Sequence, residues 1–240
     1  MSLYKFADLI VRIENRYPYT ETLCKEYAFC QNVLPDIFIT VSEEEIRKEE
    51  ERSTVRYDKG YIESVCALRK IGMQLPLYDA ILLHGVVIAY KGRGIAFLAR
   101  SGVGKTTHML WWKQVFDNAV TIINGDKPFV RFVDGVPYAY GTPWAGKEGF
   151  QTNTKVPLTD ICFLERGTIN VCEKLEEKAC AEALLKQIFI PKTYDLIGKT
   201  LELTNNLLRQ VNLYRIVCTN GPEAAQCVRD RIILDSEGSV

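Results

Sequence analysis

The chain has 240 residues, with 30 Lys and Arg against 30 Asp and Glu, and 47% of its residues are hydrophobic. This is the composition of an ordinary globular protein, and the length fits one large domain or one domain with an appendage. A formal net charge of zero excludes the basic excess by which proteins attract nucleic acids or anionic lipids. We therefore expect neither a nucleic-acid partner nor a membrane partner.

The apolar segments and the cysteines bear on the compartment. The longest apolar run, from Ala80 to Ala89, is far shorter than the roughly 18–20 residues of a membrane helix. Asp8 and Arg12 interrupt the N-terminus before the apolar core of a signal peptide can form. The eight cysteines are widely spaced, include no C-x-x-C pair and have two histidines beside them. This pattern favours a cytoplasmic protein with reduced, mostly buried thiols over a zinc protein.

Residues 1–79 predict a small N-terminal α+β section that contains no catalytic motif. Ser42 and Glu45 have the spacing of a capping box, which indicates that a solvated, highly charged helix begins at Glu43. Apolar patterning predicts the other elements of this section. They are strands at Tyr4–Ile13 and Ile37–Val41 and a helix at Ile62–Leu75 that Pro76 closes.

Residues 80–240 predict a second, larger section with a mixed sheet. Two β-rich runs, Ala80–Ala89 and Ile95–Ala99, flank the glycine-containing turn Tyr90–Gly94 and predict a hairpin. A helix follows, in which Met109, Trp112 and Phe116 share one face. The later expected elements are strands at Val120–Ile123, Phe129–Val133, Tyr138–Tyr140, Ile161–Leu164 and Tyr214–Cys218, and helices at Leu175–Ile190, Tyr194–Val211 and Pro222–Leu234. Their order predicts an α/β fold.

The segment from Ala99 to Thr106 has the spacing of a phosphate-binding P-loop, G-x-x-x-x-G-K-[ST], with Ala99 in place of the first glycine. Gly102 and Gly104 let backbone N–H groups converge on phosphate oxygens, and the following helix adds its positive N-terminal dipole. Lys105 is suited to the β- and γ-phosphates and the Thr106 hydroxyl to Mg²⁺. The sequence therefore predicts that ATP binds at Ser101, Gly102, Val103, Gly104, Lys105, Thr106 and Thr107.

A P-loop enzyme also needs a carboxylate on a neighbouring strand to hold the metal ion. Asp126 stands at the end of the predicted strand Val120–Ile123, some twenty residues after the loop. Because Asn-Gly-Asp is also turn chemistry, a plain turn aspartate is the alternative. We predict a Mg²⁺ site formed by Thr106 and Asp126.

At this point the sequence resembles the superfamily of HPr kinase/phosphorylase and phosphoenolpyruvate carboxykinase. Three features carry the resemblance: His84-Gly85 on the strand before the loop strand, the loop itself, and Asn124-Gly-Asp126 after the loop helix. A hairpin that leads into the loop is also typical of this superfamily. The resemblance covers residues 80–165 and implies a mixed-sheet P-loop fold of that type.

The match is closer to the small HPr-kinase-like proteins of bacterial peptide-modification and small-molecule pathways. Their pattern resembles Ser101-Gly-Val-Gly-Lys-Thr-Thr-His108 and the later segment Gly141-Thr-Pro-Trp-Ala-Gly-Lys-Glu148. These relatives are similar to kinases of a serine hydroxyl, in free serine or in a peptide. The resemblance also allows a homo-oligomer.

One departure from the family pattern affects the catalytic base. HPr kinases carry two adjacent aspartates where this chain has Gly125-Asp126, and they use the pair as base and metal ligand. The candidates for the base here are Asp126 itself, His84 and Glu148, and we favour Asp126 with His84 assisting, beside Lys105 as the catalytic cation. On the residues alone, a packed core histidine is the favoured explanation of His84, and only the resemblance favours a place in the site.

Four further residues are candidates for substrate contacts: Trp144, Lys147, Glu148 and Arg166. The first three lie in the irregular, glycine-containing segment 140–150, for which a surface loop anchored by a tryptophan is the alternative. Arg166 ends a predicted strand and suits transition-state charge, but it also suits an ordinary surface ion pair. His108 is expected to pack or to cap the preceding loop.

The sequence favours an ATP- and Mg²⁺-dependent kinase, in which the acceptor is a hydroxyl, expected to be that of a serine in a peptide, a protein or a free amino acid. A catalytically silent nucleotide-binding regulatory module is one alternative, and Gly125 is its main support. The other is a phosphoryl transfer of the carboxykinase type, for which 240 residues leave little room for a large substrate domain.

Overall fold

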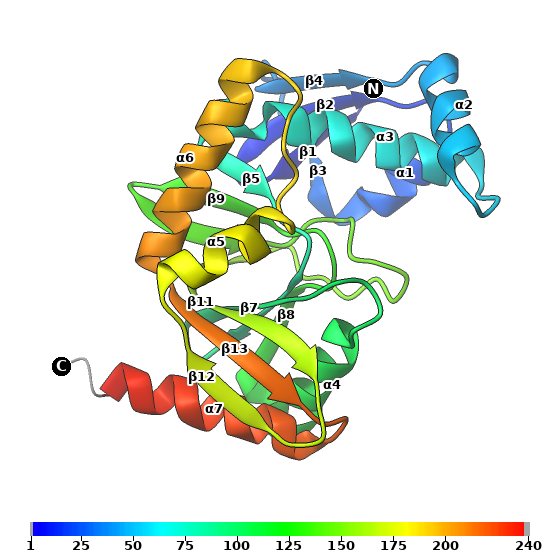
Figure 1. The fold of residues 1–240 in the computed structure, drawn as a ribbon. Helices are drawn as coiled ribbons and strands as arrows, with labels where there is room; N and C mark the ends of the chain where they lie inside the picture. The colour runs from blue at the N-terminus through cyan, green and yellow to red at the C-terminus, as the bar shows by residue number, and fades with distance from the viewer. Residues whose placement is uncertain (1, 238–240) are drawn as a thin grey trace.

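Two β-sheets organise the computed structural model, which describes residues 2–237 (Figure 1). The smaller sheet belongs to the N-terminal section and the larger one to the rest of the chain. No helix within the described residues is long and apolar enough to cross a membrane. The mixed α/β architecture expected from the sequence is confirmed.

The N-terminal sheet corrects one sequence prediction, because the run Tyr4–Ile13 forms a hairpin and not a single strand. The chain reverses at Ala7 and Asp8, whose φ angles are 50° and 62°. The Asp8 carboxylate accepts hydrogen bonds from the Tyr140 hydroxyl at 2.8 Å and from Lys155 at 3.0 Å. A turn without glycine that is fixed by distant residues leaves no local signal. The strands stand in the order β3 (Ala28–Phe29), β1 (Ser2–Phe6), β2 (Leu9–Glu14) and β4 (Ile37–Thr40).

The helices of this section begin where side chains cap them. The capping box predicted at Ser42 is confirmed: the Glu45 N–H donates to Ser42 Oγ at 3.2 Å, and Glu45 Oε2 accepts from the Ser42 N–H at 2.8 Å. The Asp58 carboxylate accepts from the Gly60 N–H at 2.8 Å, so the next helix begins before the predicted Ile62. The elements are α1 (Tyr19–Leu23), η1 (Lys25–Tyr27), α2 (Glu43–Arg52), α3 (Lys59–Gln74) and η2 (Leu75–Tyr78), of which α1, η1 and η2 were not predicted.

The larger sheet has 9 strands among the described residues, with the path β5-β9-β10-β11-β7-β6-β8 and with β13 and β12 joined beside β11. Strands β7, β11 and β13 are parallel, whereas β6 is antiparallel to both β7 and β8. The bounds are β5 (Ala80–Leu82), β6 (Val86–Tyr90), β7 (Arg93–Leu98), β8 (Val120–Asn124), β9 (Phe129–Val133), β10 (Val136–Tyr140), β11 (Lys155–Arg166), β12 (Val171–Lys174) and β13 (Asn212–Cys218).

The hairpin β6–β7 is confirmed, but the run Ala80–Ala89 is divided between two strands. Strand β5 pairs with β9, and after a break at His84 and Gly85 the chain enters β6, which pairs with β7 and β8. At the break, the His84 N–H donates to Gln187 O at 2.7 Å and the Gly85 N–H donates to Asp126 O at 2.9 Å. The break brings His84 and the end of β8 together.

Helices cover both faces of the larger sheet (Figure 1). Helices α4 (Lys105–Phe116) and α7 (Pro222–Glu237) pack on the face that carries Val86 and Ile88, and Met109 and Trp112 of α4 are buried there as predicted. Helices α5 (Glu177–Leu185) and α6 (Tyr194–Gln210) pack on the face of Val87. The predicted helix Leu175–Ile190 was too long at both ends. Strand β12 pairs with β13 up to Lys174, so the helix begins only at Glu177, and the chain turns after α5 ends at Leu185. A short turn, η3 (Asp117–Ala119), joins α4 to β8.

The N-terminal section and the larger sheet share one of the cores. Phe129 and Trp144 are buried in the same cluster as Phe6 and Ile71 of the N-terminal section. Arg131 in β9 donates to the carbonyl oxygens of Ala7 at 2.8 Å and Tyr78 at 3.2 Å. These contacts hold the small sheet against the β5–β9–β10 side of the large one.

Candidate functional site

The ends of several strands meet at one edge of the larger sheet. Strands β7, β11 and β13 are parallel, and β8 runs in the same direction as β7 because both are antiparallel to β6. Their carboxyl ends and the start of β6 therefore lie at the same edge. In open α/β sheets this is the edge where ligands bind.

The Gly-rich loop (residues 99–104) connects β7 to α4 at this edge. Gly102 and Gly104 have φ angles of 81° and 116°, which side chains with a Cβ adopt at a cost. Helix α4 begins at Lys105, and no side chain caps it. The first N–H groups of this helix have no carbonyl partner within it. The loop and the helix start thus form a concave backbone surface suited to an anion.

Lys105 lies at the base of this loop. Its ammonium donates to Ala99 O at 2.8 Å, so Ala99, in place of the usual glycine, still supplies the carbonyl that holds the lysine. Burial lowers the pKa of Lys105, and the nearby Asp126 carboxylate opposes that shift. Thr106 follows in the first turn, half-buried, and Ser101 and Thr107 are exposed. The residues predicted to contact phosphate therefore lie together in the Gly-rich loop and the first turn of α4.

Arg166, at the end of β11, contacts the loop from outside. Its Nε donates to Val103 O at 2.7 Å, and its Nη2 donates to Gly102 O at 2.8 Å. We had expected Arg166 to be a substrate contact. In this structure it holds the backbone of the Gly-rich loop.

Asp126 lies on the other flank of the loop, between two basic side chains. Its Oδ1 is 3.3 Å from His84 Nε2 and 3.0 Å from Lys127 Nζ. Burial raises the pKa of Asp126, but the hydrogen bonds and charges of His84 and Lys127 outweigh it, and the pKa lies below its usual value. Asp126 is therefore ionised at neutral pH. His84 and Asp126, which were predicted as a catalytic pair, are in contact.

A buried amide fixes the backbone of Asp126. Asn124 Oδ1 accepts from the N–H groups of Asp126 at 2.8 Å and Lys127 at 2.7 Å, and its Nδ2 donates to Thr142 O at 2.9 Å. The Thr142 hydroxyl donates to Lys127 O at 2.7 Å. Asn124 and Thr142 are both fully buried. Thr142 and Lys127 were not predicted from the sequence, where the only signal was that Asn124 and Lys127 flank Asp126 along the chain.

Gly125 has a packing reason to be glycine. A Cβ at this position would lie 2.9 Å from Ala145 O and 3.2 Å from Phe150 O. The segment 141–150 therefore passes too close for any side chain. The aspartate that the HPr kinase pattern has at position 125 would therefore not fit this backbone.

The same segment places its three predicted substrate residues differently. Trp144 is 7% exposed, packs on Phe6 with ring centroids 5.5 Å apart, and donates from Nε1 to Ser64 O at 3.1 Å. It is thus the anchor of the segment, which was the alternative expectation. Lys147 and Glu148 are exposed. A Cβ on Gly146 would lie 3.4 Å from Asp126 Cβ, so the tip of this segment lies against Asp126.

The charge of the Asp126 carboxylate acts on Tyr61 of α3, in the N-terminal section. Burial raises the pKa of Tyr61, and the charges of Tyr57, Tyr19 and Asp126 raise it further. The rings of Tyr57 and Tyr61 are 4.9 Å apart, and those of Tyr19 and Tyr61 are 5.9 Å apart. All three are partly exposed. No sequence motif signalled this approach of the N-terminal section to Asp126.

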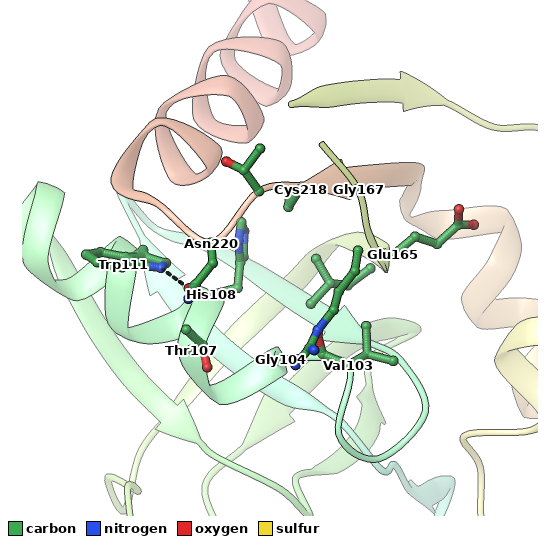
Figure 2. Close-up of a pocket in the computed structure, with 12 residues that line it drawn as sticks. Val103, Gly104, Thr107, His108, Trp111, Glu165, Gly167, Cys218 and Asn220 are labelled. Atoms are coloured by element: carbon green, nitrogen blue, oxygen red, sulfur yellow. Dashed lines mark hydrogen bonds between the residues drawn. The ribbon is translucent and has the colours of Figure 1, made fainter. Parts of the chain in front are cut away.

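A cavity of about 250 Å³ opens on the flank of the Gly-rich loop away from Asp126, between α4 and the ends of β11 and β13 (Figure 2). Its lining includes Gly104, Thr107, His108, Trp111 and Asn220. The Gly-rich loop therefore has a hollow on one flank and the carboxylate of Asp126 on the other.

The described residues by themselves place no group of three or more His, Cys, Asp or Glu side chains together for a metal ion. All eight cysteines are free thiols, and five of them are buried. Asp126 and the Thr106 hydroxyl stay the predicted protein ligands of a divalent cation at this edge. Mg²⁺ is commonly held in this way, by one or two carboxylates together with phosphate oxygens and water.

Comparison with known proteins finds similarity to solved structures but not to a sequence family. No protein-family model and no curated protein matches the chain. Among solved structures it is similar to the HPr(Ser) kinase/phosphatase from Coxiella burnetii, with 10% sequence identity and a TM-score of 0.41, over 66% of this chain and 93% of that chain. The relationship is distant and structural, and it carries no argument about activity.

Proposed function

We propose that the chain is an ATP- and Mg²⁺-dependent phosphotransferase that transfers the γ-phosphoryl group to a hydroxyl, that of a serine in a peptide, a protein or a free amino acid. The observation that carries this proposal is the position of the Gly-rich loop and Lys105 beside the paired side chains of Asp126 and His84. An anion cradle, a cation and a carboxylate at one sheet edge are the parts that phosphoryl transfer needs.

In this proposal the Gly-rich loop is a P-loop. The positive φ angles of Gly102 and Gly104 turn backbone N–H groups toward a common point, where they stabilise phosphate oxygens. Lys105, released from Ala99 O, would bind the β- and γ-phosphates and offset the charge that develops there. Arg166 keeps the loop in shape by holding two of its carbonyl groups.

Asp126 and Thr106 fit a Mg²⁺ ion. His84 and Lys127 both contact Oδ1 of the Asp126 carboxylate, so Oδ2 would serve as the ligand. The Thr106 hydroxyl stands in the first turn of α4, next to the lysine. When bound, Mg²⁺ neutralises charge on the phosphate oxygens.

The proton of the acceptor hydroxyl needs a base. As the acceptor oxygen forms its bond to the γ-phosphorus, the bond to the bridging oxygen of ADP breaks, and the proton passes to Asp126. Asp126 is ionised at neutral pH, and His84, 3.3 Å away, orients it. Glu148, on the segment that lies against Asp126, remains the alternative base.

Gly125 supports the alternative of a silent nucleotide-binding module, because the close approach of Ala145 and Phe150 excludes a second aspartate. The two functions differ in turnover. A silent module binds MgATP without transferring phosphate, whereas a kinase loses transfer when Asp126 is changed.

The test is phosphoryl transfer from γ-labelled ATP in the presence of Mg²⁺, with free serine and serine-containing peptides as acceptors. We expect label on an acceptor, and a loss of about 10²–10³-fold in kcat for Lys105→Ala and Asp126→Asn, because each removes a charge from the reacting centre. Lys178→Ala, at an exposed lysine of α5, is the matched control and should keep full activity.

Tight binding of MgATP by the wild type with no label on any acceptor would overturn the kinase in favour of the silent module. Equal activity of wild type and Lys105→Ala would overturn the P-loop assignment itself.

A further inference from the structure

The cavity beside the Gly-rich loop is lined largely by uncharged groups (Figure 2). Two charged side chains at its rim are already engaged. Arg166 donates to loop carbonyl groups, and Glu165 accepts from Arg215 at 3.1 Å and 2.8 Å. With its charges satisfied internally, the cavity suits a neutral ligand group and not a further phosphate.

His108 lies in the wall of this cavity and is 3% exposed. Its Nε2 accepts the hydrogen bond of Trp112 Nε1–H at 3.1 Å, so Nε2 carries no proton. Burial lowers the pKa of His108 to about 4, which keeps the ring neutral. The single proton of a neutral ring must then be on Nδ1.

The Nδ1–H of His108 has no acceptor among the described residues. Trp112 uses Nε2, and Phe97 packs edge-on against the ring at 4.7 Å. Figure 2 shows the ring rising from α4 toward the chain segment of Cys218 and Asn220. Because His108 lines the cavity, its Nδ1–H is available to an acceptor on a ligand that enters it.

Asn220, beside Trp111 of α4, presents an oriented amide in the same cavity lining. Asn220 Oδ1 accepts from Trp111 Nε1 at 3.1 Å, which fixes the side chain and leaves its NH₂ group as the free end. The neighbouring Thr219 is held in turn by Asn170, whose Oδ1 accepts from its N–H at 2.9 Å and from its hydroxyl at 3.1 Å. The cavity lining thus offers two fixed donors, the Nδ1–H of His108 and the NH₂ group of Asn220.

We propose that this cavity holds the nucleoside part of the nucleotide, and that His108 Nδ1 donates to an oxygen or ring nitrogen of that nucleoside. The inference rests on the proposed function, which places the phosphates on the Gly-rich loop. Asp126 lies on one flank of the loop and the cavity on the other, so a triphosphate on the loop extends its reacting end toward Asp126 and its nucleoside toward the cavity. The cavity has no free carboxylate to serve an acceptor hydroxyl.

The experiment compares the dissociation constants of MgATP and magnesium tripolyphosphate, measured by titration calorimetry on the full chain. We expect wild type to bind MgATP at least tenfold more tightly, because tripolyphosphate has no nucleoside. The double variant His108→Phe/Trp112→Phe removes the donor without orphaning the Trp112 N–H, and it should lose about tenfold in affinity for MgATP and nothing for tripolyphosphate.

Two variants control for packing. Trp112→Phe alone keeps the His108 donor and should retain the preference for MgATP. His108→Asn/Trp112→Phe restores a donor near the position of Nδ1 and should restore the preference. Circular dichroism and thermal melting select the variants that fold.

Equal affinity of wild type for the two ligands, or an unchanged ratio in a folded His108→Phe/Trp112→Phe variant, would overturn this inference and leave the proposed function standing. Failure of wild type to bind either ligand would overturn both.

Discussion

Arg166 could either neutralise charge on the reacting phosphate or hold the Gly-rich loop, and its hydrogen bonds distinguish these two roles. An arginine that neutralises transition-state charge must be free to reach phosphate oxygens, but this guanidinium is held by the carbonyl groups of Gly102 and Val103. Such bonds fix the loop before any ligand arrives, which reduces the ordering cost of binding. Its effect should therefore fall on affinity and not on the chemical step.

We predict that Arg166→Ala raises the dissociation constant of MgATP by about tenfold with little change in kcat, since each hydrogen bond of this kind contributes roughly 0.5–1.5 kcal/mol. Binding titration and steady-state kinetics measure the two effects. Arg47→Ala removes an exposed arginine of α2, outside the candidate site, that pairs with Glu51 and serves as the control. A fall in kcat at constant affinity would instead make Arg166 a contact of the reacting phosphate.

At the scale of elements, the packing of β8 against the segment 141–150 determines which side chains can lie beside Asp126. Asn124 and Thr142 tie the two together through buried hydrogen bonds. Gly125 lies where the backbones come closest. A side chain at residue 125, whatever its chemistry, therefore meets the backbone of the segment 141–150 and forces it to shift.

Replacement of Gly125 by alanine should destabilise the protein by about 1–3 kcal/mol, because the added Cβ meets two backbone carbonyl oxygens that cannot move aside cheaply. Denaturant unfolding measures the change. The control is Gly198→Ala in α6, where nothing lies within 4 Å of the added Cβ. There we expect a gain of roughly 0.5–1 kcal/mol from helix propensity. If Gly125→Ala were as stable as wild type, the segment 141–150 would have to be free to move away from Asp126.

For the whole molecule, the main question is whether the N-terminal section is a separate unit. Trp144, from the larger section, is buried against Phe6 and Phe129 and bonds to Ser64 of α3. Asp8 is held by Tyr140 and Lys155. The proposed site also lies where α3 approaches Asp126. These shared contacts favour one cooperative structure.

We predict that Trp144→Ala lowers the free energy of unfolding by roughly 3–5 kcal/mol, the usual cost of removing a buried aromatic side chain, and that the chain still unfolds in one transition. Circular dichroism and tryptophan fluorescence, followed in the same denaturant series, should give the same midpoint. Tyr194→Ala, at a side chain that is 90% exposed, should change stability by less than about 0.5 kcal/mol. Two separate transitions in Trp144→Ala, one of them at the wild-type midpoint, would instead make the N-terminal section an independent unit.

The sequence by itself determined the features that depend on neighbouring residues. The hairpin that leads to the Gly-rich loop, the two glycines of that loop with Lys105 and Thr106 after them, and the capping box at Ser42 all follow from local rules of turns, helix starts and side-chain periodicity. The pairing of His84 with Asp126 was also expected, but only from a resemblance to a known family, because the two residues are distant in the chain.

Only the tertiary structure decided the features that depend on distant contacts. The reversal at Ala7 and Asp8 has no glycine to signal it and is fixed by residues of the larger section. The roles of three further residues depend on partners that come close only on folding. They are Gly125, Arg166 and Trp144. Such contacts leave no periodicity in the sequence, because the residues on their two sides are separated by long stretches of chain whose path the local rules do not fix.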